Sequence, residues 1–295
     1  MNIIMVESSY KQTMEPIICG RTLADCPTGG TTLKSVLLKR LEQLNDIKFL
    51  ELLIRDDFWP SAELLETIYT LNSSFIIENK QGDLLMRGFT DEKALERIEI
   101  DKESFIMTHP WELLRVNSDV LSTKKKYEIK GTIRTGATVD GELSLGAGSL
   151  ILPGVYIEGF VVIGENCKIG PNCYIRGNTS IGNNCHIGQA VEIKNSIFMD
   201  NVNAGHLSYI GDSIIGFGTN LGAGTITANF RHDGKNHVSA SLGVLVDTGL
   251  RKFGTVLGDD VHTGIHTSIF PGRKIWPHKF TLPGDVVKKD IKSKK

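Results

Sequence analysis

Residues 145–193 read LGAGSLILPGVYIEGFVVIGENCKIGPNCYIRGNTSIGNNCHIGQAVEI, and an aliphatic residue recurs there at every sixth position. Counted in sixes from Ile133 to Met199, every position is aliphatic, and glycine often follows it. This period matches neither the 3.6 residues of a helix turn nor the two residues of a strand. Self-similarity at a short fixed period indicates a solenoid of short strands, three to a coil, with one aliphatic residue of each strand inside. Residues eighteen positions apart, such as Cys167 and Cys185, are then stacked.

The repeat changes phase after Met199. The sixes resume at Tyr209, ten residues later, which predicts that the four residues Gly205 to Ser208 are extra. A second departure, residues 229–252, is predicted to be a loop excursion, after which the repeat returns at Leu257. Such irregular segments on a rigid scaffold are where functional groups usually lie. We therefore interpret His206, inside the first irregularity, as a catalytic base.

The first 125 residues alternate between strand-like and helix-like patterns, which predicts a small α/β domain. The expected strands are 2–6 and 49–54 and the hairpin 75–77 with 84–86, and the expected helices are 32–47, one from residue 61, 91–98 and 109–121. Lys124 to Lys126 read as an exposed linker. The domains are therefore placed at 1–125 and 126–295.

Bulk properties exclude several classes of protein. Lysine and arginine (33) nearly balance aspartate and glutamate (34), so a general nucleic-acid binder is not expected. No apolar run approaches the roughly 20 residues that span a bilayer, and the N-terminus lacks a signal-peptide pattern. A cytoplasmic protein is the expectation. Cys167, Cys173 and Cys185 are in phase with the repeat but form no C-x-x-C pair, so buried thiols are favoured over a zinc site.

Two segments of the first domain carry a resemblance. GGTTLKSVLLKRLEQL (29–44) and HPWELLRVNSDVL (109–121) resemble parts of sugar-1-phosphate nucleotidyltransferases. That family holds a nucleotide on a glycine-rich loop after its first strand, whereas here ESSYKQTMEPII follows, without glycine. The first domain is therefore interpreted as a shortened, degenerate and non-catalytic relative.

The second resemblance is more specific. The repeat resembles hexapeptide-repeat acyltransferases, which implies a left-handed parallel β-helix. AGHLSYIGDSIIGFGTNLGAGTITANF (204–230) is similar to the acetyltransferase domain of the bifunctional N-acetylglucosamine-1-phosphate uridyltransferase/glucosamine-1-phosphate N-acetyltransferase family. The resemblance implies His206 as the catalytic base and the Ala223 backbone N–H, in the Gly222-Ala223 turn, near the acetyl group. It implies substrate contacts by Arg176, Lys194 and Lys235 on the phosphate, and by Glu192, Tyr209, Asn220 and Asn229.

These residue types suit the chemistry that the resemblance implies. A neutral histidine can take a proton from an amine that attacks a thioester. A fixed N–H can stabilise the oxyanion intermediate, by roughly 3 kcal/mol in other enzymes. Acetyl-CoA is the expected acetyl donor, with Lys252, Arg273 and Lys274 as candidate contacts, and no metal is expected. The family also implies a homotrimer with sites between subunits.

Some alternatives stay open on the sequence alone. Phe230 stands where the family has a tyrosine, and the loop resembles archaeal-type members that also accept galactosamine 1-phosphate, so the hexosamine epimer is not fixed. A structural, regulatory or sugar-nucleotide-binding trimer is a second reading. A zinc carbonic anhydrase is a third, but His262 and His266 are four residues apart and do not share a face of a coil with period six. His232 and His237, in the excursion, are expected to face solvent.

Overall fold

The computed structural model describes residues 2–9, 11–47, 49–71, 73–91 and 94–292. Two compact units are present. The first comprises Met1–Lys11, Arg21–Cys26 and Thr32–Thr108, and the second comprises Gln12–Gly20, Pro27–Thr31 and His109–Lys295. The second unit holds all the predicted site residues.

The first unit is an α/β structure, as predicted. Its mixed sheet has the order β1 (Ile3–Val6), β4 (Glu51–Arg55), β7 (Leu84–Phe89), β6 (Ser74–Glu78), β8 (Leu95–Arg97). Its helices are α1 (Leu33–Leu41), which Thr32 caps by accepting from the Ser35 N–H, and α2 (Ala62–Leu71). Its shorter elements are η2 (Glu42–Leu44), β5 (Phe58–Trp59) and β9 (Phe105–Ile106). The elements η1 (Lys11–Met14), β2 (Pro27–Thr28) and β3 (Thr31–Thr32) lie wholly or partly in the segments 12–20 and 27–31 of the second unit.

The helix predicted over residues 91–98 is wrong. Residues 95–97 form strand β8, which pairs in parallel with β6, and residues 92 and 93 lie outside the described residues. All three residues of β8 are exposed, so no apolar face was available to hold a helix in place. Pairing with the backbone of β6 outweighed the helix propensity of this short segment.

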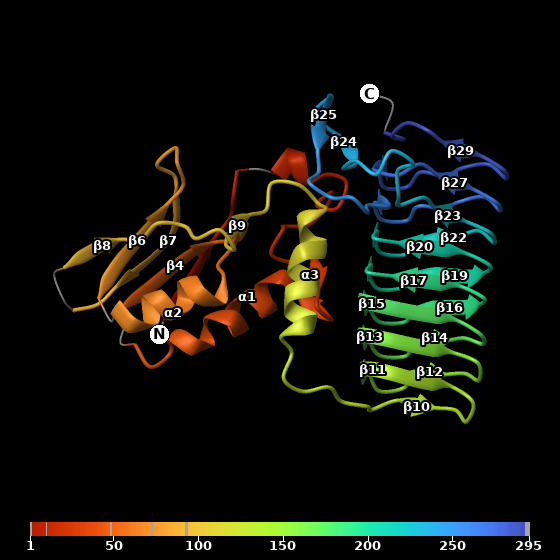
Figure 1. Cartoon of the computed structure of the whole chain (residues 1–295), viewed down its shortest axis with the longest axis horizontal. Helices are drawn as coiled ribbons and strands as arrows, with labels where there is room; N and C mark the ends of the chain where they lie inside the picture. Colours follow the sequence, from red (N-terminus) through yellow and green to blue (C-terminus); the bar gives the residue numbers. More distant parts are fainter. Residues whose placement is uncertain (1, 10, 48, 72, 92–93, 293–295) are drawn as a thin grey trace. The chain divides into compact units, whose positions relative to one another are not determined.

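The second unit is a parallel β-solenoid with three faces, seen as a stack of coils in Figure 1. The first face consists of β10 (Thr132–Ile133), β12 (Leu150–Ile151), β14 (Lys168–Ile169), β16 (His186–Gln189), β19 (Asn203–His206) and β22 (Asn220–Leu221). Three long strands bend from the second face into the third: β11 (Thr138–Leu145), β13 (Tyr156–Ile163) and β15 (Tyr174–Ile181).

From the next coil on, each long strand is replaced by two short ones. The second face continues with β17 (Glu192–Lys194), β20 (Tyr209–Gly211), β23 (Ile226–Thr227), β27 (Ser268–Ile269) and β29 (Val286–Val287). The third continues with β18 (Ile197–Phe198), β21 (Ile214–Ile215), β26 (Thr255–Leu257) and β28 (Arg273–Ile275). The predicted excursion contains the antiparallel hairpin β24 (Val238–Ser241) and β25 (Val244–Asp247). This is the left-handed parallel β-helix of hexapeptide repeats that the sequence led us to expect.

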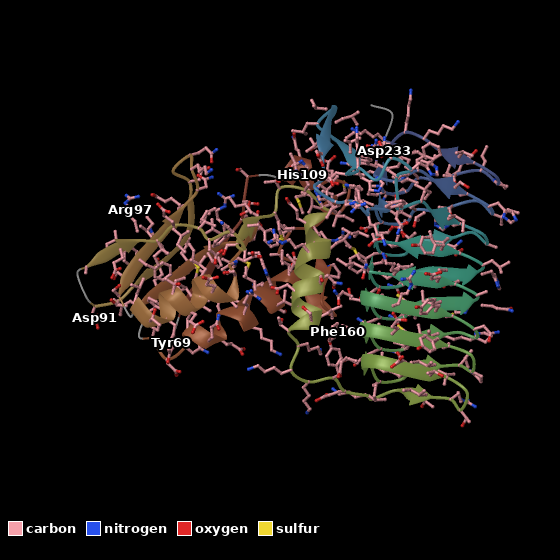
Figure 2. All side chains as sticks on the ribbon, in the orientation of Figure 1. Tyr69, Asp91, Arg97, His109, Phe160 and Asp233 are labelled. Atoms are coloured by element: carbon pink, nitrogen blue, oxygen red, sulfur yellow. The ribbon has the colours of Figure 1, made fainter. Side chains whose placement is uncertain are left out.

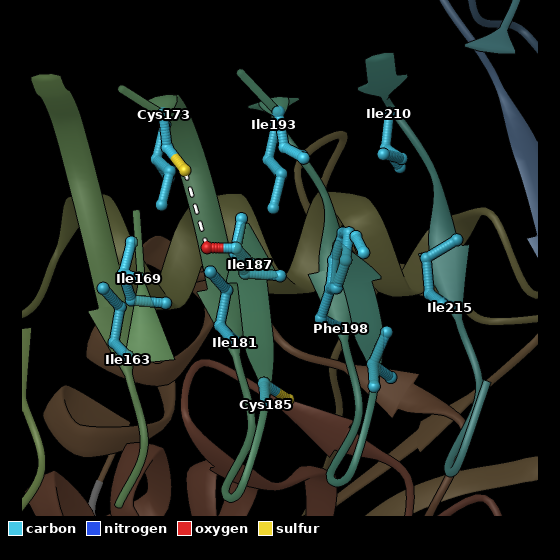
Figure 3. Packing of buried hydrophobic residues seen from close by; sticks show 14 of the residues in the cluster. Ile163, Ile169, Cys173, Ile181, Cys185, Ile187, Ile193, Phe198, Ile210 and Ile215 are labelled. Atoms are coloured by element: carbon cyan, nitrogen blue, oxygen red, sulfur yellow. Dashed lines mark hydrogen bonds between the residues drawn. The ribbon is translucent and has the colours of Figure 1, made fainter. Parts of the chain in front are cut away.

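The interior of the solenoid is a column of stacked aliphatic side chains, as Figure 3 shows. Ile169, Ile187 and Ile193 are fully buried, and the predicted cysteine stack lies among them. The Cys173 thiol donates to the Ile187 carbonyl at 3.5 Å and to the Gly188 carbonyl at 2.7 Å. The thiols therefore act as small buried groups whose weak donors are satisfied by backbone.

The predicted change of phase is present, but it begins at an earlier corner than predicted. It results from a missing residue, whereas the sequence predicted four added residues. Stacked residues are eighteen apart up to the pair Ile175 and Ile193, whereas Ile181 stacks on Phe198, seventeen residues later. One residue is therefore missing at the corner after Ile193, and Phe198 occupies the core position assigned to Met199. The next core residues are Ala204 and Ile210, at regular intervals of six, so residues 205–208 are no insertion.

Helix α3 (Glu112–Ser122) belongs to the solenoid unit, although the sequence placed it before the domain boundary. The side chain of Asn117 is 1% exposed and joins three segments of this unit. Its Oδ1 accepts from the Gly29 N–H and the Ser180 hydroxyl, both at 2.8 Å, and its amide donates to the Asn178 carbonyl at 2.9 Å. Because the buried amide finds partners for both its oxygen and its nitrogen in other segments, these contacts hold the helix on the coils.

Within the described ranges, every helix is too short or too polar to cross a membrane.

Candidate active site

His206 lies at the end of β19, where the chain turns from the first face to the second. Ala204, two residues earlier, is fully buried, whereas His206 is exposed because the strand ends there and the chain leaves the regular alternation at the corner. Leu207, with a φ of 51°, makes the turn, and Tyr209 opens the second face. The histidine is therefore presented at a corner by a regular coil and not by an inserted loop.

The turn Gly222-Ala223-Gly224 lies at the same corner of the following coil. The Gly222 N–H donates to the Thr263 carbonyl at 3.1 Å, and the Gly224 N–H donates to the His206 carbonyl at 3.2 Å. Between them, the Ala223 N–H has no acceptor among the described residues. One uncommitted backbone donor thus lies in the turn that is hydrogen-bonded to the catalytic candidate.

Arg176 and Lys194 stack on adjacent strands of the second face, as their spacing predicted. Each cation already has a carboxylate partner. Arg176 Nε and Nη2 donate to Glu192 Oε1 at 3.0 and 2.8 Å, and Lys194 Nζ lies 3.3 Å from Asp212 Oδ2. The pairing of Glu192 with Arg176 crosses between coils. Two cations therefore stand side by side, fixed in place by carboxylates.

Tyr209, Asn229 and Asp212 continue this group of polar residues. Asn229 Nδ2 lies 2.9 Å from the Tyr209 hydroxyl oxygen and 2.5 Å from Asp212 Oδ2. Burial raises the pKa of the Tyr209 phenol, while the hydrogen bond from Asn229 lowers it and the charge of Asp212 raises it. The phenol is thus held neutral, as a hydroxyl able to donate one hydrogen bond.

The remaining predicted substrate contacts are less closely tied to this group. Asn220 is exposed on β22 of the first face, beside β19. Lys235 is exposed in the excursion, where its N–H donates to Asp233 Oδ1 at 3.2 Å; Figure 2 labels Asp233. Asp233 itself pairs with Arg231 at 2.7 Å. The side chain of Lys235 is therefore exposed on a loop and is not part of the group around Arg176.

The three candidate coenzyme contacts lie in different environments. Lys252 is exposed, and Arg273 Nη2 donates to the Val238 carbonyl at 2.9 Å, which ties the coil to the hairpin. Lys274 is 2% exposed, with Nζ 3.4 Å from the Glu15 carbonyl oxygen and 5.4 Å from the Trp276 ring centroid. Lys274 therefore joins the segment 12–20 to the coil in this structure and does not face solvent.

Lys274 gives the fold a measurable pH dependence. Burial lowers the pKa of Lys274 to about 8; the charges of Asp290 and Glu15 oppose this effect, and those of Lys292 and Arg273 add to it. Burial and the nearby charge of Lys274 in turn lower the pKa of His109. Figure 2 labels His109, which stacks on Trp111 with ring centroids 4.4 Å apart. Between pH 8 and about 10.5 the unfolded chain keeps a proton that the folded chain has lost, so stability rises with pH in that window.

We expect the replacement Lys274→Met to remove this rise, which amounts to about 1.4 kcal/mol per pH unit at most. The measurement is the free energy of unfolding at pH 7.5, 9 and 10, with Lys288→Met, an exposed lysine of the last coil, as control. The free energy of unfolding of the wild type minus that of Lys274→Met should therefore increase from pH 7.5 to pH 10. A difference independent of pH would contradict the assignment.

Two features of the site were not predicted. His237 was expected to face solvent, yet it is 1% exposed, and its Nε2 lies 2.9 Å from the Asn229 carbonyl oxygen. Asp212 was not singled out, although it accepts from Lys194, Asn229 and, at 3.1 Å, Asn195. Its only signal in the sequence was an acidic residue directly after an apolar strand position. His232 is exposed, as expected.

Metal chemistry finds no support in the side-chain arrangement. Across the part of the chain that the structure describes, no group of three or more histidine, cysteine, aspartate or glutamate side chains could hold a metal ion. His262 and His266, the candidates for an anhydrase site, are both exposed.

Comparisons with known proteins identify relatives of the solenoid unit. The family model described as the GMPPB C-terminal domain matches residues 157–291, which run from the second long strand to the last coil and include every site residue above. The bifunctional sugar-1-phosphate nucleotidylyltransferase/acetyltransferase of Sulfurisphaera tokodaii is 33% identical over 79% of this chain and 60% of its own length. The bifunctional protein GlmU of Methanococcus maripaludis (strain C7) is 41% identical over 79% of this chain and 58% of its own. The chain carries the hexapeptide-repeat domain of this family.

The chain spans about 60% of the length of these bifunctional relatives. Among solved structures, the UDP-N-acetylglucosamine acyltransferase of Campylobacter jejuni aligns with 56% of this chain and 68% of its own, at 13% identity and a TM-score of 0.33. The family model matches residues 157–291, inside the solenoid unit, and this region also contains the corner with His206.

Proposed function

We propose that the protein is an N-acetyltransferase that moves acetyl from acetyl-CoA to the amine of an amino-sugar 1-phosphate. Glucosamine 1-phosphate is the favoured acceptor, galactosamine 1-phosphate the other candidate, and the product would serve UDP-N-acetylhexosamine synthesis. Two neighbouring features carry the proposal. An exposed histidine and an uncommitted backbone N–H lie at the corner between the first and second faces, and two adjacent cations with a chain of hydrogen-bonding groups lie on the second face that follows.

The acceptor amine forms the new bond in the proposed reaction. The lone pair of the neutral amine attacks the thioester carbonyl carbon, and His206 takes the proton that the nitrogen then sheds. The negative charge that develops on the carbonyl oxygen is stabilised by the Ala223 N–H. Collapse of the tetrahedral intermediate breaks the carbon–sulfur bond, so CoA leaves as a thiol once it is protonated.

The phosphate of the acceptor is assigned to the cations Arg176, Lys194 and Lys235. Arginine offers a planar pair of donors and lysine a point charge, a combination suited to a dianion. Because Glu192 and Asp212 already neutralise two of these cations, the empty site carries little net charge. Binding then replaces part of each ion pair with contacts to the phosphate. Tyr209, Asn220 and Asn229 are left to bind the sugar.

The proposal has three further parts, which concern the co-substrate, the oligomeric state and the role of the first unit. Acetyl-CoA is the co-substrate, and no metal takes part. A homotrimer, with sites completed at subunit interfaces, is the proposed assembly. The first unit is proposed to be a shortened, non-catalytic relative of nucleotidyltransferases.

The test is release of free thiol from acetyl-CoA, followed with a thiol reagent, in the presence of each hexosamine 1-phosphate. We expect release that depends on the acceptor and yields an N-acetylated product by mass spectrometry. Glucose 1-phosphate, which lacks the amine, is the matched negative control. Absence of release with both acceptors, from folded protein, would favour the structural or regulatory reading of the solenoid.

A further inference from the structure

The group around Asp212 has a fixed direction of hydrogen bonding. The carboxylate of Asp212 is 9% exposed at its side chain and pairs with Lys194, so it accepts and does not donate. Asn229 Nδ2 lies 2.5 Å from Asp212 Oδ2. The reverse orientation of the amide would place Asn229 Oδ1 against the carboxylate with no proton between them. The carboxylate therefore decides which end of the Asn229 amide faces it.

The second amide hydrogen of Asn229 is committed as well, since Nδ2 is also 2.9 Å from the Tyr209 hydroxyl oxygen. The tyrosine oxygen is thereby an acceptor in this pair, and its own hydrogen must point elsewhere. Asn229 Oδ1 accepts no hydrogen bond from any residue in the described ranges. The two groups left over are one acceptor, Asn229 Oδ1, and one donor, the Tyr209 O–H.

The backbone is shaped to permit this arrangement. Asp212 has a φ of 51°, a conformation that asparagine and aspartate tolerate best among non-glycine residues, and it sits at the second corner that is one residue short. A Cβ on Gly211 would come within 2.5 Å of the Tyr209 hydroxyl oxygen and 2.6 Å of Asn229 Nδ2. Gly211 therefore leaves the space in which the tyrosine and the amide meet.

We infer that Asp212 is a positioning residue that sets the hydrogen-bond polarity of the acceptor site, so that Asn229 Oδ1 accepts from a hydroxyl or amino group of the sugar and the Tyr209 hydroxyl donates to a sugar or phosphate oxygen. This inference rests on the proposed function for the identity of the ligand. The direction of the chain from Asp212 through Asn229 to Tyr209 does not depend on it.

The direction is tested first, without substrate, by a double-mutant cycle in thermal unfolding. Asn229→Asp places a second carboxylate against Asp212 and is expected to lower Tm by about 4 °C or more. Asp212→Asn in the same chain restores a donor between the two positions, so the swapped pair should recover at least half of that loss. An Asn229→Asp variant as stable as wild type would overturn the inferred direction.

The consequence for recognition is tested by steady-state kinetics. Asp212→Asn lets the Asn229 amide flip, so the KM for glucosamine 1-phosphate should rise about 5- to 50-fold while the KM for acetyl-CoA stays within about twofold. The swapped pair should keep the raised KM although its stability recovers, because its donors and acceptors are reversed. A purely structural role predicts that both recover together, and that result would overturn the inference.

Asp260→Asn is the matched control. Asp260 also has a left-handed φ, 50°, and an ion pair, with His278 at 3.3 Å, but it is exposed and in another coil. We expect wild-type Tm and KM values from it. If the wild-type protein transfers no acetyl group, the proposed function fails, whereas the unfolding cycle still decides whether Asp212 sets the direction.

Discussion

Replacing His206 with alanine is expected to reduce the rate of acetyl transfer about 10²- to 10⁴-fold, the range that a positioned general base contributes. The physical reason is that the amine carries an extra proton once it has attacked the thioester, and no other side chain of the described corner is placed to take it. His206 is exposed at the end of a regular strand, so its removal should leave the coils intact. Thiol release at saturating acetyl-CoA measures the loss.

His262→Ala is the control for this prediction. His262 is also exposed, and it lies on the first face in register with Asn220, one coil beyond the site. It should retain full activity, and both variants should unfold at the wild-type temperature. A His206→Ala variant that keeps more than a tenth of the wild-type rate would remove the histidine from its role.

The second large effect is expected from Lys194→Met. The substitution keeps the length of the side chain and removes a charge that the phosphate is proposed to contact. A hydrogen bond to a charged group contributes about 1.5–3 kcal/mol, so the KM for the hexosamine 1-phosphate should rise about 10- to 100-fold. The same change leaves the buried carboxylate of Asp212 with only the amide donors of Asn195 and Asn229.

The loss of stability in Lys194→Met approaches the 3–5 kcal/mol typical of a broken buried pair, lessened by those two amides. Chemical denaturation measures it, and steady-state kinetics measure the KM. Lys168→Met, an exposed lysine on the first face, should change neither quantity. An unchanged KM together with lowered stability would assign Lys194 to the structure alone.

The phase change shows what a six-residue period can and cannot predict about this fold. Counting in sixes found an irregularity between Met199 and Tyr209 but could not distinguish four added residues from two that are missing. The register of Phe198 on Ile181 and of Ile215 on Phe198 decides for missing residues, one at each of two corners. The physical reason is that a corner can lose one residue where Asn195 adopts a left-handed φ of 46°, whereas each strand must keep an aliphatic residue inside.

In the N-terminal unit, local sequence patterns predicted some elements correctly and one element wrongly. Strong patterns, such as the helix after Thr32 and the hairpin at 74–89, were predicted correctly because local propensity and apolar spacing agree there. The short segment 95–97 became a strand because a neighbouring edge offered hydrogen bonds, which no local pattern reveals.

The sequence by itself determined the solenoid and the stacking of Arg176 on Lys194, because both follow from a period that fixes which residues are neighbours. His206 became a candidate through the resemblance of its motif, since the insertion that the period placed around it does not exist. Only the tertiary structure decided how those side chains are partnered. It paired Arg176 with Glu192, buried His237 and placed Asp212 between Lys194 and Asn229. Asp212 and Asn229 belong to different coils, and their contact depends on side-chain directions at a shortened corner, which no spacing along the chain encodes.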